Sequence, residues 1–306
     1  MRLLIEVPTW LGDAIMATPA IENLINHFEN VEVTILGSFV STKLFINHPK
    51  VVNIVIDQTK SSKNRYFEIY KLSKEFKTFD MLVSFRSSFS SRLLSFLTSI
   101  KDRYNYKKIK EEKHQVLKYN EFINSIIKKN YKAGDLKIYF DRKKYDKPTL
   151  GINPGATYGS AKRWYPEEFA KVAISMSKTH DIVIFGGPGE TDIAKDIEEK
   201  LIQVDIKNYK NLAGKTSISE LIEYIGGLDL FITNDSGPMH VAAAFKVPTI
   251  AIFGPTKYRE TNQWNNPNQT IISKNLDCAP CMKRVCPLGH HDCMKLIKAE
   301  DILNNI

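Results

Sequence analysis

Residues 2–21, RLLIEVPTWLGDAIMATPAI, decide the fold of the first half of the chain. An apolar strand pattern, RLLIEV, runs into a short turn that contains Gly12, and Asp13 stands at the head of an apolar helical pattern. A strand, a glycine turn and a helix in this order are typical of a parallel α/β sheet. We therefore expect the Asp13 carboxylate just after a strand, where it either caps the helix and sits on its dipole or carries chemistry; the two roles are compatible.

The same alternation of strands and helices continues through the rest of the chain. Near-continuous apolar runs predict strands covered on both faces, at residues 31–37, 51–57, 81–85, 149–155, 181–187, 228–234 and 249–255. Helical patterns fall between them, at residues 19–28, 66–76, 166–178, 190–201, 219–225 and 239–245. This order predicts right-handed βαβ units and mostly parallel sheets.

The length of the chain favours two domains. It has 306 residues, whereas one compact domain usually holds ~100–200. Residues 141–149, DRKKYDKPT, are charged, contain a proline and lack an apolar period, so they predict a linker. We expect domains at 1–145 and 146–306, with a cleft between them, because ligands of open α/β sheets bind beyond the carboxyl ends of the strands.

The composition excludes several classes of protein. A hydrophobic content of 43% and a charged content of 25% are those of a globular protein. No apolar run approaches the ~18 residues of a transmembrane helix. Glu6, Pro8 and Asp13 interrupt the first apolar run, so we expect no secretory signal. Four cysteines without such a signal indicate a reducing compartment, and the cytoplasm is the expected location.

The positive charge is concentrated in the first half. The net charge is +9; residues 1–150 hold 26 Lys and Arg against 16 Asp and Glu, and residues 151–306 hold 17 against 18. A basic surface suits phosphates, nucleic acid or an anionic membrane face. The alternative is a set of solvated lysines that serve solubility alone.

The loop NPGATYGSAKRWYPEEF, residues 153–169, joins a strand to a helix. Small residues, among them Gly155 and Thr157, let backbone N–H groups approach phosphate oxygens, and Lys162 adds a full charge. The loop matches neither the dinucleotide fingerprint nor the P-loop. A plain turn with a solvated Lys-Arg pair is the alternative.

The loop ITNDSGPMHVAAAF, residues 232–245, also joins a strand to a helix. Ser236, Gly237 and the amides after them stand at a helix N-terminus, which suits a phosphate. Asp235 and Ser236 could instead simply cap this helix, and His240 could be a packed residue. Glycine turns at 185–190, 211–217 and 253–256 extend the pattern, and together they suit a nucleotide diphosphate.

The segment CAPCMKRVCPLGHHDC, residues 278–293, holds all four cysteines, Cys278, Cys281, Cys286 and Cys293, with His290 and His291 between the last two. Its C-x2-C start resembles a small zinc site. The later spacings are tighter than those of paired zinc knuckles. A zinc site and free thiols both remain open.

These motifs in this order resemble glycosyltransferase family 9, the ADP-heptose:lipopolysaccharide heptosyltransferases, most closely the heptosyltransferase II type. The resemblance runs nearly end to end and rests on PTWLGDAIMATPA, NPGATYGSAKRW, NDSGPMHVAAA, FGPT and CAPCMKRVCPLGHHDCM. It implies the GT-B fold, in which two Rossmann-like doubly wound domains face each other across a cleft. The N-terminal domain would take the acceptor and the C-terminal domain the ADP-heptose.

The resemblance also implies a reaction and its residues. L-glycero-D-manno-heptose would pass with inversion from ADP-heptose to the first heptose of the lipopolysaccharide inner core, whose acceptor is a phosphorylated Kdo-lipid A. Asp13 would be the base, Lys162 would neutralise the leaving diphosphate, and no metal or other cofactor would be required. The donor would be held by Gly155, Thr157, Lys162, Asp235, Ser236, Gly237 and His240. For the acceptor the candidates, placed on no motif, are Arg65, Arg86, Arg92 and Arg103. Such enzymes work at the cytoplasmic face of the inner membrane, as soluble or peripheral proteins.

Three alternatives were weighed against this function. Another heptosyltransferase of the family, for the first or third heptose, would share the donor loops. A basic nucleic-acid-binding protein with a metal site at its cysteines is disfavoured, because the basic residues and the cysteines lie in different halves and no groove-reading motif is present. A nucleotide-dependent oxidoreductase is disfavoured because no G-x-G-x-x-G follows the first strand of either half. We therefore expect no nucleic-acid partner.

Overall fold

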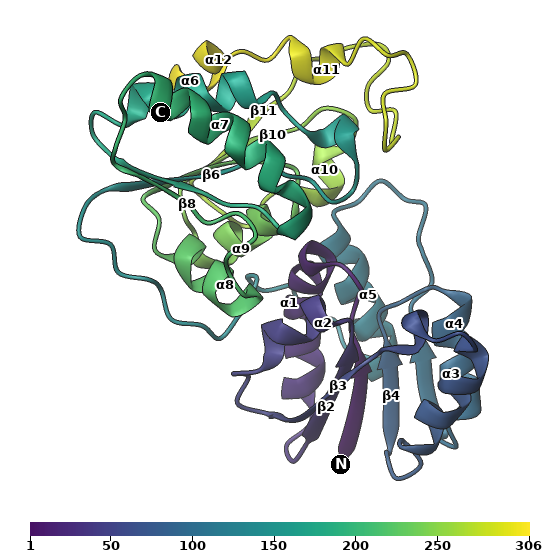
Figure 1. Ribbon diagram of the computed structural model, residues 1–306. Helices are drawn as coiled ribbons and strands as arrows, with labels where there is room; N and C mark the ends of the chain where they lie inside the picture. Colours follow the sequence, from purple (N-terminus) through teal and green to yellow (C-terminus); the bar gives the residue numbers. More distant parts are fainter. The chain divides into compact units, whose positions relative to one another are not determined.

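The computed structural model describes residues 1–306 and divides into two compact units, Met1–Tyr139 and Phe140–Ile306 (Figure 1). The boundary predicted from the sequence lies after residue 145, a few residues later. Residues 129–148 contain no helix or strand, and their first part packs on unit 1. For example, Leu136 is buried, and the Lys137 amide donates to the Thr18 hydroxyl at 2.9 Å. The composition of this segment marks the linker, whereas these contacts assign its first part to unit 1.

Unit 1 is built on a five-stranded sheet in which every neighbouring pair is parallel. Its strands are β1 (Arg2–Glu6), β2 (Glu32–Gly37), β3 (Val51–Ile56), β4 (Met81–Ser84) and β5 (Asp102–Asn105). The strand order is β3-β2-β1-β4-β5. From β1 the chain adds β2 and then β3 on one side of the sheet, and it then adds β4 and β5 on the other side. This change of direction places a topological switch point between β1 and β4.

Two pairs of helices pack together in unit 1, α1 with α5 and α3 with α4. The helices are α1 (Leu11–His27), α2 (Phe39–Thr42), α3 (Arg65–Lys74), α4 (Phe89–Leu97) and α5 (Gln115–Ile127), with short 3-10 turns at Lys43–Phe45 and Thr59–Ser61. Helices on a parallel sheet of this strand order make the unit doubly wound, as predicted.

Helix α1 runs without a break through Pro19. It starts at Leu11, which confirms the helix predicted near Asp13, and it joins that helix to the pattern predicted at residues 19–28. A proline inside a helix removes one N–H donor, and the carbonyl four residues earlier loses its partner. Here that carbonyl belongs to Ile15, and the Thr18 hydroxyl donates to it at 2.7 Å. The helix therefore continues through Pro19, and Asp13 lies in its first turn.

Unit 2 is built on a six-stranded parallel sheet. Its strands are β6 (Thr149–Asn153), β7 (Asp181–Ile184), β8 (Tyr209–Asn211), β9 (Leu230–Asn234), β10 (Thr249–Ile252) and β11 (Gln269–Ile272). The order β11-β10-β9-β6-β7-β8 is that of the Rossmann fold, with its switch point between β6 and β9. The prediction of two Rossmann-like, doubly wound units is confirmed.

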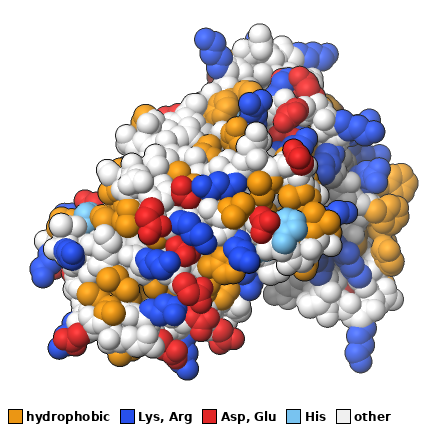
Figure 2. All heavy atoms as spheres, turned by 90° about the horizontal axis from the view of Figure 1, so that it is seen from above, with side chains coloured by type: hydrophobic (Ala, Val, Ile, Leu, Met, Phe, Trp, Pro, Cys, Tyr) orange, Lys and Arg blue, Asp and Glu red, His pale blue; other side chains and the backbone are white.

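The helices of unit 2 lie between these strands and after the last one. They are α6 (Pro166–Met176), α7 (Thr191–Gln203), α8 (Ile218–Gly226), α9 (Gly237–Phe245), α10 (Tyr258–Thr261), α11 (Asp292–Lys295) and α12 (Ala299–Leu303), with 3-10 turns at Ser160–Lys162 and Pro188–Glu190. Seen from the side of α6, α7 and α12, the surface shows acidic and basic side chains interspersed (Figure 2). None of the helices of the chain combines the length and the hydropathy needed to span a bilayer.

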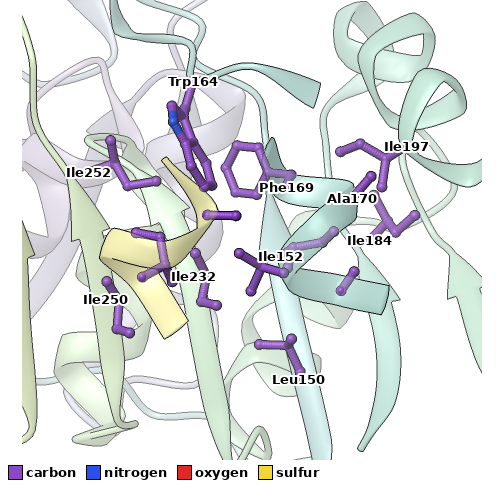
Figure 3. Close-up of a cluster of buried hydrophobic side chains, with 14 of the residues drawn as sticks. Leu150, Ile152, Trp164, Phe169, Ala170, Ile184, Ile197, Ile232, Ile250 and Ile252 are labelled. Carbon is purple, nitrogen blue, oxygen red and sulfur yellow. The ribbon is translucent and has the colours of Figure 1, made fainter. Parts of the chain in front are cut away.

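The core of unit 2 reaches directly to the loop that carries Lys162. Isoleucine and leucine side chains of β6, β9 and β10 surround Trp164 and Phe169 (Figure 3). The two aromatic rings meet edge to face, with centroids 4.7 Å apart. The Trp164 indole donates to the Ile297 carbonyl at 2.9 Å, so its polar N–H is also satisfied. This buried tryptophan anchors the loop two residues after Lys162.

Candidate active site

Unit 1 contains a cavity of about 500 Å³ at the carboxyl ends of β1 and β4. Asp13 lines it from the first turn of α1, Arg86 from the loop after β4, and Tyr119 from α5. Burial raises the pKa of Tyr119 well above its usual value, and the nearby charge of Asp13 adds to this. Asp13 therefore lies at the switch point of the sheet, where doubly wound folds bind ligands.

Asp13 is not the N-cap of α1. The N-cap position belongs to Trp10, which makes no capping hydrogen bond with its side chain, and Asp13 is the third helical residue. A carboxylate in the first turn still interacts favourably with the helix dipole, typically by ~0.3–1 kcal/mol. The interpretation of Asp13 as a cap is therefore wrong, and its interaction with the helix dipole makes a modest contribution to stability.

Arg86 joins the ends of three strands at the wall of the cavity. Its Nη1 lies 3.2 Å from Oε1 of Glu6, which ends β1, and 3.1 Å from Oδ2 of Asp57, which follows β3. Its Nε donates to the Val7 carbonyl at 2.8 Å. Arg86 therefore fixes the start of the loop that leads to Asp13.

The two carboxylates beside Arg86 differ in their pKa. Burial raises the pKa of Glu6, although Arg86 and the hydroxyls of Ser84 and Ser91 oppose this. Burial also acts to raise the pKa of Asp57, but hydrogen bonds from Thr59 and the charge of Arg86 outweigh it and lower that pKa. Asp57 is thus the more firmly ionised partner of Arg86.

Two of the four arginines predicted for the acceptor line this cavity. Arg65 Nε and Arg86 Nη2 are buried and have no hydrogen-bond partner within the chain. A buried donor without a partner costs ~1–3 kcal/mol, and both arginines place a positive charge at the wall of the cavity. Arg92 and Arg103 do not line the cavity; Arg92 is exposed on α4, and Arg103 lies over the Phe96 ring, 5.7 Å from its centroid.

In unit 2 the structure brings together two residues that were predicted from separate loops. Nζ of Lys162 lies 2.5 Å from Oδ2 of Asp235, and the Thr256 hydroxyl donates to the same oxygen at 2.6 Å. Lys162 also lies over the ring of Tyr158, 4.7 Å from its centroid. Asp235 is only 5% exposed. A diphosphate at this edge would compete with Asp235 for the charge of Lys162.

Two asparagines, which were not predicted as site residues, tie the loops after β6 and β9 to each other. Asn153 Nδ2 lies 3.3 Å from the Ser236 Oγ, and Asn234 Nδ2 donates to the Pro154 carbonyl at 2.7 Å. Asn234 Oδ1 also accepts from the Trp164 amide at 3.1 Å. Each asparagine is the last residue of a strand at the switch point. That shared position is the sequence signal that could have identified them.

The other residues predicted for the donor lie on the same two loops. Ser236 is the N-cap of α9 without a capping side-chain bond, and the helix begins at Gly237. Gly155 is buried, and a Cβ atom there would lie 2.1 to 2.4 Å from the carboxylate atoms of Glu190, so a larger residue would displace that side chain. Thr157 is exposed, whereas His240 is buried in the first turn of α9.

The four cysteines are free thiols, of which Cys293 is buried and the others are partly exposed. Hydrogen bonds from backbone amides, foremost that of His291, lower the pKa of Cys286. Burial, together with the other three cysteines, raises the pKa of Cys293 to about 11. As the side chains stand, no three His, Cys, Asp or Glu residues are arranged to hold a metal ion.

The cysteine-rich segment, residues 278–293, supports the loop that carries Lys162. Tyr158 donates its hydroxyl to the Met282 carbonyl at 2.8 Å, and the Ala161 amide donates to the Arg284 carbonyl at 3.0 Å. His291 Nε2 lies 2.9 Å from the Ala161 carbonyl. Its Nδ1 lies 3.2 Å from the Tyr165 hydroxyl. One neutral tautomer of His291, protonated on Nε2, satisfies both partners.

Comparisons with known proteins agree on one family. The model of glycosyltransferase family 9 (heptosyltransferase) matches residues 125–291. Lipooligosaccharide heptosyltransferase 2 of Campylobacter jejuni subsp. jejuni serotype O:6 (strain 81116 / NCTC 11828) is 45% identical over 317 residues, which covers 100% of this chain and 98% of the relative. The protein of the same name from serotype O:2 (strain ATCC 700819 / NCTC 11168) is 46% identical over 314 residues, covering 99% and 96%. The solved structure of Escherichia coli ADP-heptose lps heptosyltransferase II has a TM-score of 0.84 at 20% identity and covers 100% of this chain and 97% of that one, which shows a shared fold.

Proposed function

Because this chain belongs to glycosyltransferase family 9, the heptosyltransferases, and has their GT-B fold, we propose that it adds the second heptose of the lipopolysaccharide inner core. The donor is ADP-heptose, which supplies L-glycero-D-manno-heptose, and the acceptor is the first core heptose on a phosphorylated Kdo-lipid A. Two nearly full-length relatives that are named for the second heptose transfer support this acceptor. The fold alone does not distinguish the second transfer from the first.

The observation that carries the proposal is the cavity of unit 1. Asp13 lines it together with Arg65 and Arg86, and the two other carboxylates of its wall, Glu6 and Asp57, pair with Arg86. A sugar acceptor needs a base for one hydroxyl and donors for its other oxygens, and this cavity offers both. In residues 1–150, Lys and Arg outnumber Asp and Glu, and this excess of positive charge suits an acceptor that carries phosphate and Kdo carboxylates.

The proposed reaction is a single displacement. Asp13 takes the proton of the acceptor hydroxyl, whose oxygen attacks the anomeric carbon while the bond from that carbon to the diphosphate oxygen breaks. A direct attack inverts the configuration and requires no covalent enzyme intermediate. In unit 2, Lys162 and the N-terminus of α9 stabilise the negative charge that develops on the leaving ADP.

The order of the transfers is tested with a series of acceptors. Purified enzyme is incubated with ADP-heptose and with one of three Kdo-lipid A acceptors, which carry zero, one or two heptoses. The masses of the products are measured by mass spectrometry. We expect one added heptose on the one-heptose acceptor and none on the others. Transfer to the acceptor without heptose would identify the enzyme that adds the first heptose, and transfer to the two-heptose acceptor would identify a third-heptose enzyme.

The proposed reaction needs no divalent metal or other cofactor. Lys162 and the α9 N-terminus supply the positive charge that a metal supplies in other glycosyltransferases, and the sequence has no DxD motif near these loops. Enzyme treated with EDTA and assayed in EDTA should therefore keep its kcat within about two-fold. Loss of activity that added magnesium or manganese restores would contradict this prediction.

The acceptor also determines where the proposed enzyme works. Lipid A is anchored in a bilayer, so we place the enzyme on the cytoplasmic face of the inner membrane, as a protein in transient contact with that surface. The proposed reaction has no role for nucleic acid.

A further inference from the structure

The outer sides of α3 and α4 in unit 1 carry large aromatic side chains that face solvent. Five of these side chains are 44% to 69% exposed, and we call them the α3–α4 aromatic face: Tyr66, Phe67, Tyr70, Phe89 and Phe96. Monomeric proteins rarely expose a contiguous apolar patch without a use for it. This face is not used by the proposed reaction.

The aromatic face is continuous across the two helices. The rings of Tyr66 on α3 and Phe89 on α4 meet edge to face, with centroids 6.4 Å apart. Phe89, Arg92 and Phe96 follow one another at helical spacing, and all three are exposed. The opposite sides of the same helices are buried in the core of unit 1 through residues such as Leu72 and Leu94. The exposed aromatic stripe is therefore additional to the side that packs on the sheet.

Basic side chains lie against the rings of this face. Lys71 lies 4.6 Å from the centroid of Phe67, and Lys74 lies 4.3 Å from that of Tyr70. The guanidinium carbon of Arg103, on the edge strand β5, lies 5.7 Å from the centroid of the Phe96 ring. Two acidic residues, Glu68 and Glu75, also lie on or beside α3, and Glu68 pairs with Lys71 at 3.0 Å. With the exposed Arg92 included, the cations outnumber these acids.

This combination of groups is complementary to the surface of an anionic bilayer. Aromatic rings partition into the boundary between headgroups and acyl chains, and Lys and Arg extend their charge to the phosphates. Each such cation near an anionic surface strengthens the attraction. A second copy of the chain is a poorer partner, because it would bring the same positive charge to the interface and the two faces would repel each other. Single-stranded nucleic acid would need free ring faces for its bases, whereas cations cover three of these five rings.

We propose that the α3–α4 aromatic face is the surface through which unit 1 docks onto an anionic lipid bilayer. The same two helices contribute the side chains of Arg65, Leu72, Ser91 and Leu94 to the cavity that holds Asp13. Docking through their outer sides therefore keeps the acceptor cavity next to the lipid surface from which a lipid-anchored acceptor extends. This inference rests on the proposed function for its purpose, but the binding itself is measured without substrate.

The test is co-sedimentation of the full chain with vesicles of phosphatidylcholine and about 30% phosphatidylglycerol. The wild type should bind them, and should bind at least 10-fold less to pure phosphatidylcholine or in about 0.5 M salt, where charge attraction is screened. The double variant Phe89→Ser/Phe96→Ser should bind at least 10-fold less than the wild type to the mixed vesicles. Thermal unfolding followed by circular dichroism checks that both forms are folded.

The matched control is Phe39→Ser. Phe39 is 57% exposed and also lies near a lysine, 5.3 Å from Lys43 to its centroid, but it belongs to α2. This variant should bind vesicles like the wild type. Any of four results would overturn the inference. The first two are an equal loss of vesicle binding in Phe39→Ser and a wild type that binds no vesicles. The other two are binding of an oligonucleotide without vesicles and a wild-type dimer that the double variant Phe89→Ser/Phe96→Ser dissociates.

Activity assays separate this inference from the proposed function. The double variant should keep wild-type activity on a deacylated, water-soluble one-heptose acceptor and lose at least 10-fold on the same acceptor embedded in vesicles. Equal activity of variant and wild type on both acceptors would reject the docking surface and leave the reaction intact. A wild type that binds vesicles but transfers heptose to neither acceptor would reject the proposed function alone.

Discussion

Asp13→Asn should lower kcat by roughly 10²- to 10⁴-fold, which is the contribution that a positioned general base typically makes. Asparagine has nearly the same shape as aspartate and cannot accept a proton at neutral pH. Asp13 lines the cavity of unit 1 that we propose for the acceptor, whereas the groups proposed to hold the donor belong to unit 2. Affinity for ADP-heptose, measured by calorimetry, should therefore stay within about two-fold of the wild type.

A matched substitution isolates the electrostatic contribution of Asp13 to its helix. Asp192→Asn removes the acidic residue from the first turn of α7, where no chemistry is proposed. Both variants lose the favourable interaction with a helix dipole, of ~0.3–1 kcal/mol, but only Asp13→Asn should lose turnover. The assignment of Asp13 as the base fails if Asp13→Asn weakens donor binding as much as it lowers the rate, or if it keeps more than about a tenth of the activity.

Lys162→Ala should weaken the binding of ADP by roughly 10- to 100-fold, for two reasons that act together. The variant loses a charge-assisted contact to phosphate. It also leaves Asp235 as a 5% exposed carboxylate whose cation is gone and whose remaining partner is the Thr256 hydroxyl. That negative charge then faces the phosphates of the ligand. Calorimetric titration with ADP measures the change directly.

A double variant separates the two effects of Lys162→Ala. Lys162→Ala/Asp235→Asn removes the uncompensated charge and should bind ADP more tightly than Lys162→Ala, although more weakly than the wild type. Lys171→Ala is the control, because Lys171 pairs with Glu168 at 2.8 Å but is 56% exposed, and it should leave affinity within about two-fold. Unchanged affinity in Lys162→Ala would show that this lysine does not contact the donor.

The strands that the sequence failed to predict share one physical property. The missed strands β5, β8 and β11 all lie at the edge of a sheet, and β5 and β8 read as the polar segments DRYN and YKN. An edge strand pairs on one side only and need not be covered on both faces, so it can lack a continuous apolar run, although the edge strand β3 has one and was predicted. All the interior strands were predicted from such runs: β1, β2, β4, β6, β7, β9 and β10.

The loops of the site were predictable because they follow interior strands, but the partners within the site were not. Lys162 and Asp235 lie on loops whose proximity depends on β6 and β9 being neighbours. The strand order likewise brings Glu6 and Asp57 to Arg86. Apolar periodicity identifies strands without giving their order, so the sequence could not separate the four arginines, which were acceptor candidates placed on no motif. The structure separates them into two that line the cavity and two, Arg92 and Arg103, beside the aromatic face.

The contacts of the cysteine-rich segment make the position of Lys162 depend on a much later part of the chain. The loop that carries Lys162 donates hydrogen bonds to the carbonyls of Met282 and Arg284, and its Ala161 carbonyl bonds with the His291 ring. During synthesis, β6 and Lys162 leave the ribosome long before these residues do. The sheet of unit 2 can begin to assemble while the loop still lacks these partners. The loop of Lys162 therefore gains these contacts only near the end of translation.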